Sequence, residues 1–129
     1  MNITTKTTNI DLTPDVSDYL ARKLAMIEKL IEERQGELIV HAVLARTTEH
    51  HRAGDVFKAE VNINIGNRHI NAEAERDTLY AAIDQVKDEL TREIKSNKEK
   101  RLSVFRRGAA RLKRMIKSGK IKPTQELNQ

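Results

Sequence analysis

The residues whose chemistry stands out in this chain are the lysines and arginines toward its end. Residues 94–129 contain 12 Lys/Arg and 2 Asp/Glu, a net charge of +10, whereas residues 1–93 contain 12 Lys/Arg and 17 Asp/Glu, a net charge of −5. Clustered cations bind the phosphates of nucleic acid by displacing their counterions. The split predicts an acidic body with a basic, polyanion-binding end; the alternative is a solvated tail that only maintains solubility. The basic residues of this end are Lys95, Lys98, Lys100, Arg101, Arg106, Arg107, Arg111, Lys113, Arg114, Lys117, Lys120 and Lys122.

Other chemistries have little support in the sequence. There is no Cys, which excludes a disulfide framework and a cysteine-based zinc site. His50 and His51 are adjacent in a polar stretch, and His41 and His69 fall on expected strands, so no set of three convergent metal ligands is recognisable. No glycine-rich phosphate loop precedes a helix, and no serine–histidine–aspartate arrangement is present. We expect no enzymatic activity, no cofactor and no metal.

The elements that must position the cations begin with a strand over residues 3–10, which are rich in Thr and Ile. Thr13 followed by Pro14 is a typical helix start, because threonine caps the first turn and proline suits the first helical position. Apolar residues then recur every three or four positions, which predicts an amphipathic helix. The helix is expected to end at Gln35-Gly36, where glycine can adopt a left-handed conformation.

Three further strands are expected in the middle of the chain. Residues 38–45 are apolar except for His41, which is typical of a strand flanked by other strands. Residues 57–65 alternate strictly between apolar and polar, which predicts one buried and one wet face. A tight turn at residues 66–67 leads to a fourth strand over residues 70–74.

A second helix follows, with Asp77 as its expected cap and an apolar stripe over residues 79–94. The element order is then β-α-β-β-β-α. The first two strands must be parallel because a helix connects them, and the later strands form an antiparallel meander. The predicted fold class is α+β: a two-layer sandwich of a four-stranded sheet with both helices on one face. We predict a domain over residues 1–101 and a basic, helical or disordered tail over residues 102–129.

The second helix is expected to overhang the sheet, because its sheet-facing stripe stops at Ile94. Lys95, Lys98 and Arg101 would then cluster on one side of the protruding end. A second apolar stripe over residues 102–116 is surrounded by cations and contains Gly108, which costs about 1 kcal/mol relative to Ala in a helix. Such a segment can order itself on RNA, enter the groove of a partner protein or lie on a membrane.

Several separated segments resemble the ribosome hibernation promoting factor / ribosome-associated inhibitor A (sigma-54 modulation protein) family. The resemblance covers about residues 1–101 and agrees with the element order above. The segments that carry it are MNITTK at residues 1–6, the Thr13-Pro14 helix start, RKL at residues 22–24, EKL at residues 28–30, and DTLYAAID at residues 77–84 with Leu90-Thr91-Arg92 and Lys95 after it.

The resemblance implies a cytoplasmic, non-catalytic translational silencer in the decoding groove of the small ribosomal subunit, where it competes with mRNA and tRNA. Its partners would be the small subunit and its rRNA, with no membrane and no small-molecule substrate, and the protein would be monomeric off the ribosome. The RNA-binding residues carried over are Lys6, Arg22, Lys23, Lys29, Arg92, Lys95, Lys98 and Arg101. The basic end adds Lys100, Arg106, Arg107, Arg111, Lys113 and Arg114.

Some positions depart from the family pattern. Glu89 and Glu93 stand where lysine and glutamine are usual, and Thr7-Thr8 replaces a common Gly-Arg pair. We expect these differences to weaken the contacts of the body and to leave more of the affinity to the basic end. The chain is also expected to lack the C-terminal domain with which the long family form pairs two ribosomes.

Two readings stay open at this stage. Tyr80, early in the second helix, is expected to pack against the core with a wet hydroxyl, rather than to serve as a stacking platform for bases. The alternative function is a protein- or membrane-interaction module anchored by residues 102–117. Salt separates the two functions, because binding to RNA weakens steeply as the salt concentration rises whereas insertion of an apolar face does not.

Overall fold

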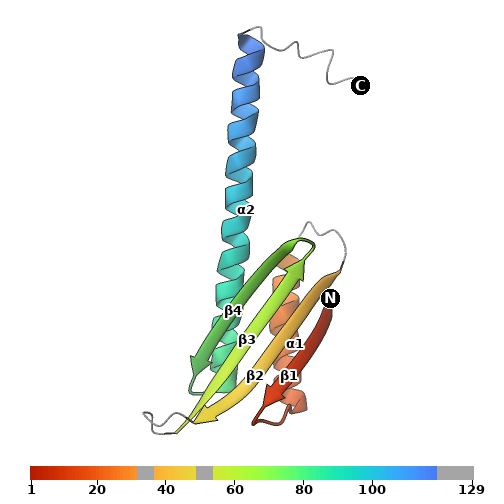
Figure 1. Ribbon diagram of the computed structural model, residues 1–129, viewed down its shortest axis with the longest axis vertical. Helices are drawn as coiled ribbons and strands as arrows, with labels where there is room; N and C mark the ends of the chain where they lie inside the picture. Colours follow the sequence, from red (N-terminus) through yellow and green to blue (C-terminus); the bar gives the residue numbers. More distant parts are fainter. Residues whose placement is uncertain (32–36, 49–53, 119–129) are drawn as a thin grey trace. The chain divides into compact units, whose positions relative to one another are not determined.

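The computed structural model describes residues 1–31, 37–48 and 54–118 of the chain. Their elements are β1 (Asn2–Thr8), α1 (Pro14–Leu30), β2 (Leu38–Thr48), β3 (Asp55–Ile65), β4 (Arg68–Arg76) and α2 (Leu79–Lys117). The strands form one sheet in the order β1-β2-β3-β4, in which β1 and β2 are parallel and the other pairs antiparallel (Figure 1). The predicted α+β fold class and element order are confirmed.

The chain divides into two compact units, Met1–Ile94 and Lys95–Gln129. The first unit contains the sheet, α1 and the first part of α2. The second contains the rest of α2, which stays helical to Lys117, with Gly108 inside the helix. The expectation that the basic end overhangs the sheet stays a prediction, and residues 119–129 lie outside the described part of the chain.

The core of the first unit lies between one face of the sheet and the two helices. It is almost entirely aliphatic, with Leu24 and Ile27 from α1, Val40 from β2 and Leu90 from α2 among its most buried members. No polar or charged residue in the described ranges is buried. Burying such a side chain contributes about 1.5–3 kcal/mol, so burial of these side chains is the main force that holds both helices on the sheet.

Two element ends differ from the prediction. The helix α1 ends at Leu30, not at Gln35-Gly36, because Ile31 leaves the helical conformation at ψ 88° while its side chain stays in the core. Because Ile31 is buried although it lies outside the helix, the apolar stripe in the sequence continues past the last helical residue. The stripe therefore does not mark the end of the helix. Gln35 and Gly36 lie outside the described residues.

The start of α2 also differs by one residue from the prediction. The cap is Thr78, whose hydroxyl accepts a hydrogen bond from the amide of Ala81 at 3.1 Å, and not Asp77. On the opposite edge of the sheet, β1 stops at Thr8, because Asn9 has a positive φ of 59° that a strand cannot contain. Asparagine tolerates this left-handed conformation better than most residues.

Candidate nucleic-acid interface

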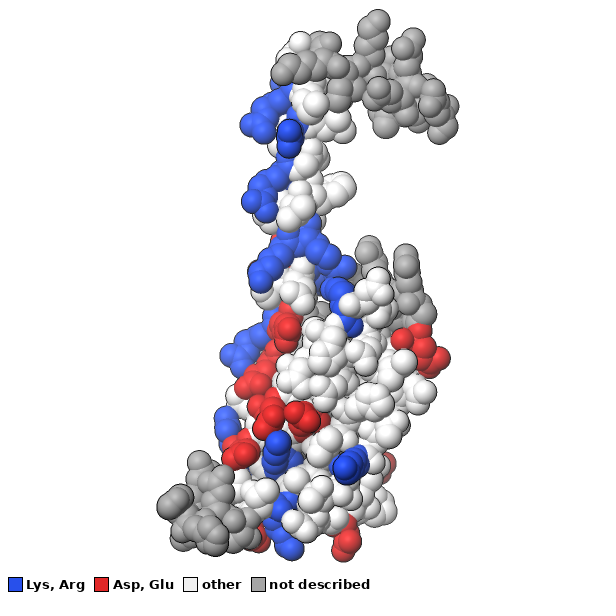
Figure 2. All heavy atoms as spheres, viewed as in Figure 1, with Lys and Arg blue, Asp and Glu red and all other residues white. Residues whose placement is uncertain are grey.

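The second part of α2 is densely basic. Between residues 95 and 118 the chain has ten Lys/Arg and one acid, Glu99. All ten cations are exposed except Lys98, which is half-buried. Figure 2 shows Lys and Arg gathered along this part of the helix, whereas both signs of charge are interspersed over the sheet. A helix with one sign of charge concentrates a positive potential that attracts a polyanion.

From residue 102 onward the cations occupy one half of the helix. Successive residues are about 100° apart around an α-helix, which places the basic and the apolar residues on opposite halves. The basic half carries Arg106, Arg107, Arg111, Lys113, Arg114 and Lys117. The apolar half carries Leu102, Val104, Phe105, Ala109, Leu112, Met115 and Ile116.

The apolar half is largely open to solvent. Phe105 is 72% exposed, and Leu102, Val104 and Leu112 are also exposed. Lys98 and Arg101 fall between this stripe and the sheet-facing stripe that ends at Ile94, because the spacing from Ile94 through them to Phe105 is 4, 3 and 4. A basic turn therefore separates two apolar stripes of α2.

In the first unit, α1 supplies two exposed cations on one side. Arg22 and Lys29 are seven residues apart, which places them on the same face and about 10 Å apart along the helix axis. Arg92 on α2 is also exposed. These three side chains are available to phosphates.

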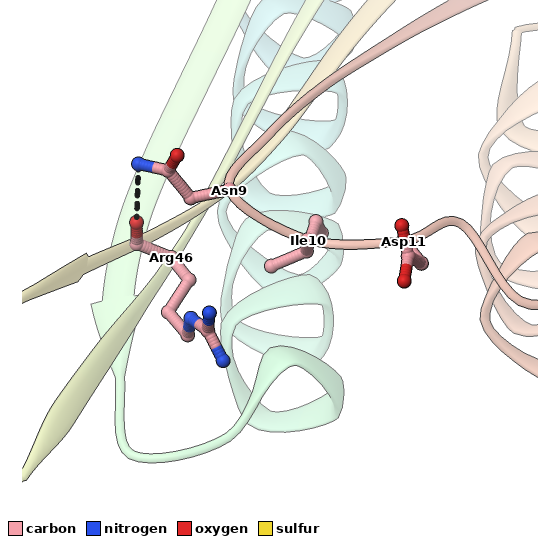
Figure 3. Close-up of a pocket in the computed structure, with 4 residues that line it drawn as sticks. All are labelled: Asn9, Ile10, Asp11 and Arg46. Atoms are coloured by element: carbon pink, nitrogen blue, oxygen red, sulfur yellow. Dashed lines mark hydrogen bonds between the residues drawn. The ribbon is translucent and has the colours of Figure 1, made fainter.

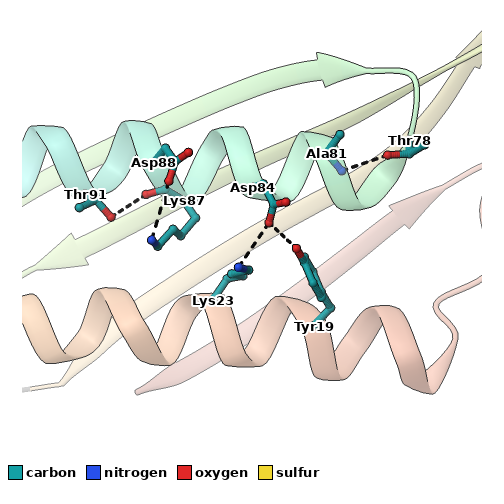
Figure 4. Close-up of polar contacts among 8 residues, drawn as sticks. All are labelled: Tyr19, Lys23, Thr78, Ala81, Asp84, Lys87, Asp88 and Thr91. Carbon is teal, nitrogen blue, oxygen red and sulfur yellow. Dashed lines mark hydrogen bonds and ion pairs between the residues drawn. The ribbon is translucent and has the colours of Figure 1, made fainter.

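Lys23 is engaged within the protein. Its ammonium lies 3.5 Å from Asp84 Oδ1 on α2, and its side chain is 27% exposed. The Tyr19 hydroxyl donates a hydrogen bond of 2.5 Å to the same carboxylate oxygen (Figure 4). The acceptor and the partial burial of the phenol raise the pKa of Tyr19 above its ordinary value. Asp84 thus clamps α1 to α2. Because the Lys23 ammonium is paired with Asp84, it is less available to phosphates than an exposed cation.

Tyr19 and Tyr80 meet beside this clamp. Their ring centroids are 4.9 Å apart, and their planes are at 89°, an edge-to-face contact. The Arg22 guanidinium and the Lys23 ammonium lie 5.8 and 5.1 Å from the Tyr19 centroid. A shallow hollow of about 640 Å³ adjoins the pair and is lined by Asp15, Asp18, Tyr19, Ala21, Arg22, Ala25 and Tyr80. Tyr80 packs on Tyr19 and not on the core as expected, and it remains 42% exposed.

Lys6 lies on the other face of the sheet from α1. In the register of β1 with β2, Lys6 pairs with Val43, whereas its neighbours Thr5 and Thr7 pair with Ala42 and Leu44 of the core. Side chains alternate between faces along a strand. The structure therefore does not bring Lys6 together with Arg22 and Lys29.

The open face of the sheet carries paired charges. Lys58 Nζ lies 3.0 Å from Glu73 Oε1 on the neighbouring strand, which lowers the pKa of Glu73 and raises that of Lys58. Nearby, Asn71 donates a 2.6 Å hydrogen bond to Asn62, which His69 also contacts at 3.2 Å. Charges that neutralise each other offer little attraction to a polyanion.

Sequence reasoning missed one further hollow, of about 590 Å³, where β1 gives way to α1. Asn9, Ile10, Asp11 and Arg46 line it, and Asn9 Nδ2 donates a 3.5 Å hydrogen bond to the Arg46 carbonyl (Figure 3). The Arg46 guanidinium also lies 4.0 Å from Asp55. The positive φ of Asn9, which turns the chain here, has no clear signal in the sequence.

The histidines form no metal centre among the described residues. His41 and His69 are exposed on the sheet, His50 and His51 lie outside the described ranges, and no cluster of three possible metal ligands occurs within those ranges. Over the same ranges, no helix has the length and apolar character needed to cross a bilayer.

Comparison with known proteins identifies what the chain is similar to. A family model described as sigma 54 modulation protein / S30EA ribosomal protein matches residues 2–102. A ribosome hibernation promoting factor of Pseudomonas putida is 29% identical over 103 residues, which are 80% of this chain and 92% of the relative. A ribosome hibernation promotion factor of Picosynechococcus is 33% identical over 71% of this chain, but the match spans only 46% of that relative.

Solved structures agree with these matches. The N-terminal domain of Thermus thermophilus Protein Y superposes with a TM-score of 0.61 at 29% identity, over 74% of this chain and 98% of that domain. A ribosomal subunit interface protein of Coxiella burnetii gives a TM-score of 0.59 at 19% identity, over 77% of this chain and 99% of the other, and supports the fold.

Proposed function

The chain belongs to the sigma 54 modulation protein / S30EA ribosomal protein family of ribosome hibernation factors, and we propose that it silences translation. It would do so by occupying the decoding groove of the small ribosomal subunit. There it would exclude mRNA and the anticodon ends of tRNA. The relatives named above as ribosome hibernation factors support the ribosome as partner. This role places the protein in the cytoplasm and requires no catalysis.

The observation that carries the proposal is the strongly basic character of α2 after Ile94. Ten cations and one acid on a helix form a surface that a phosphate backbone neutralises by releasing its own counterions. Six phosphate contacts would make the logarithm of the binding constant fall with that of the salt concentration with a slope of roughly −4 to −5. We propose residues 1–101 as the ribosome-binding domain and residues 102–129 as an arm that adds affinity.

The contacts divide by their environment. Arg22, Lys29 and Arg92 in the first unit are exposed and can reach phosphates, whereas Lys23 is tied to Asp84 and contributes less. Lys6, on the opposite face of the sheet from α1, would need a separate RNA surface. In the second unit the proposed contacts are Lys95, Lys98, Lys100, Arg101, Arg106, Arg107, Arg111, Lys113 and Arg114.

Translation in a purified system tests the blocking mechanism. Inhibition should rise in proportion to occupancy, reach completion at one protein per ribosome, and be relieved by added mRNA or tRNA. Accumulation of cleaved rRNA with time at substoichiometric protein would instead identify a nuclease and contradict the proposal.

A second candidate function rests on the exposed apolar half of residues 102–117. A helix with Phe and Leu on one half, and with cations and no acid on the other, also suits the surface of an anionic membrane or the groove of an acidic protein. Binding that persists at high salt and is lost when Phe105 and Leu112 are replaced by Ser would favour this alternative.

A further inference from the structure

We infer that the hollow beside Tyr19 and Tyr80 binds a single unstacked nucleobase. The inference rests on the proposed RNA-binding function and adds to it a defined site on the helix side of the first unit. Tyr80 supplies the stacking surface, because its side chain is 42% exposed while Tyr19 is already faced by Arg22, Lys23 and the Tyr80 ring. Unpaired bases are commonly recognised by stacking on aromatic side chains.

The tyrosine pair is held in place before any ligand arrives. The Tyr19 hydroxyl is fixed by Asp84, and Figure 4 shows Tyr19 and Lys23 converging on that carboxylate from α1. Tyr80 is flanked in α2 by the buried Leu79 and Ala82, which anchor its backbone. A preorganised aromatic surface loses little conformational freedom when a ligand stacks on it.

The charges around the hollow favour a base over a phosphate. Asp15 and Asp18 line it on the α1 side and would repel a phosphate group, whereas Arg22 lines the same hollow and offers one cation. A carboxylate accepts hydrogen bonds from the N–H groups of a base edge. Guanine presents two adjacent N–H donors, which a carboxylate can accept together, whereas uracil presents only one.

The same α1 face offers a path for the flanking backbone. Arg22 borders the hollow, and Lys29 lies two helical turns further along on the same side. A nucleotide whose base occupies the hollow can therefore direct its phosphate toward Arg22. The ligand class is a nucleobase with paired N–H donors, either in a single-stranded stretch of RNA or in a free nucleotide.

Tyrosine fluorescence of the full-length protein gives a direct test. The chain has two Tyr and no Trp, and both tyrosines border this hollow, so the emission reports on this site alone. GMP should quench the emission saturably and UMP much more weakly. Emission that stays flat with GMP, and with a short guanine-containing single-stranded RNA, would overturn the inference.

Four variants extend the test to single side chains. Tyr80→Leu removes the stacking surface and should weaken binding of the short RNA roughly 5- to 150-fold, the effect of losing one stacked base. Tyr80→Phe keeps the ring and should retain binding, with Tyr19 as the reporter. Asp18→Asn should reduce the preference for GMP over UMP while stacking persists. Equal binding of the short RNA by the Tyr80→Leu and Tyr80→Phe variants would overturn the inference. An unchanged preference for GMP over UMP in both Asp18→Asn and Asp15→Asn would also overturn it. If the Leu variant fails to fold, the Phe and Asn arms still decide.

One comparison shows whether the bound base belongs to RNA or to a free nucleotide. A second shows whether the base site and the silencing proposal fail separately. Quenching by the RNA at lower concentration than by GMP identifies an RNA base, and the reverse order identifies a free nucleotide. If the wild-type protein sediments with ribosomes while its emission stays flat with both probes, the hollow is not a base site and the silencing proposal stands. If emission is quenched but the protein does not sediment with ribosomes, the silencing proposal fails and the base site stands.

Discussion

Asp84 connects the two helices of the first unit through one carboxylate oxygen. That oxygen accepts the Tyr19 hydroxyl at 2.5 Å and faces the Lys23 ammonium at 3.5 Å. The contact explains why an acid follows the apolar Ala82 and Ile83 in the DTLYAAID segment: the apolar residues enter the core, and the acid binds the neighbouring helix at its rim. The same segment therefore builds the core, the clamp and the exposed tyrosine.

Replacing Asp84 with Ala should lower the free energy of unfolding by about 1 kcal/mol. The loss is modest because Asp84 is 48% exposed and solvent screens its charge. The raised pKa of Tyr19 means that its neutral form is stabilised by folding, so this contribution is present below pH 10.0 and is lost as the pH rises through the folded pKa. A tyrosinate absorbance titration should show the pKa of Tyr19 moving back toward 10.0 in the variant. An unchanged titration would contradict the clamp.

The pair formed by Lys58 and Glu73 predicts a separate pH dependence. The pKa of Glu73 is lowered by Lys58, so its contribution to stability is present above its ordinary value of 4.5 and is lost as the pH falls through the folded value. Glu73→Gln should cost less than about 1 kcal/mol at neutral pH, because the pair is partly exposed. Urea unfolding at several pH values should show that the free energy of unfolding falls less steeply with acid in the variant than in the wild type. An equal fall in both proteins would show that the pair does not cause this pH dependence.

For the helices and strands, the periodicity of the sequence predicted which faces are buried but not the residues at which the elements end. Strict alternation in β3 and the stripe of α1 indicated which faces are buried, and the structure agrees. The ends were missed because Ile31 stays buried outside the helix, and because Asp77 and Thr78 are both good caps. The contact of Tyr19 with Tyr80 could not be predicted from the sequence, since it depends on how α1 and α2 pack beside each other on the sheet.

Residues 102–129 should add affinity for the ribosome without adding stability to the first unit. Truncation after Arg101 removes eight cations, including Lys120 and Lys122, but no residue of the core cluster. The free energy of unfolding should therefore change by no more than about 0.5 kcal/mol. Ribosome binding should lose about 3–4 units of salt slope if half of the removed cations contact phosphates.

Thermal melts and salt-dependent ribosome binding of the 1–101 fragment check both parts of this prediction. Gly108→Ala in the full chain is a matched control, because a Cβ at this position has open space around it and the change keeps every charge. It should leave the salt slope unchanged. A marked fall in the melting temperature of the fragment, with binding intact, would make residues 102–129 a structural element and not an RNA arm.

The two units of the chain have different proposed tasks. The acidic first unit provides the fold and, through Arg22, Lys29 and Arg92, a few exposed cations. The second contains half of the chain's Lys/Arg but only two acids, a net charge of +10. The charge split between an acidic body and a basic end is visible in the sequence. The sequence could not show that Lys23 is engaged or that Lys6 lies on the opposite face from α1, because both depend on helix packing and strand register.

The proposed silencing role depends on contacts between ribosomal phosphates and the cations on α2 near Ile94. The most direct measurement is the salt dependence of ribosome binding for a variant with Arg92, Lys95, Lys98 and Arg101 replaced by Ala. The slope should decrease by about 3 in magnitude, which corresponds to 0.7–0.9 for each lost contact, while the double replacement of Arg68 and Arg76 on β4 should leave it nearly unchanged. A quadruple variant that binds ribosomes with the wild-type slope, or a β4 variant that loses as much slope per charge, would contradict the account.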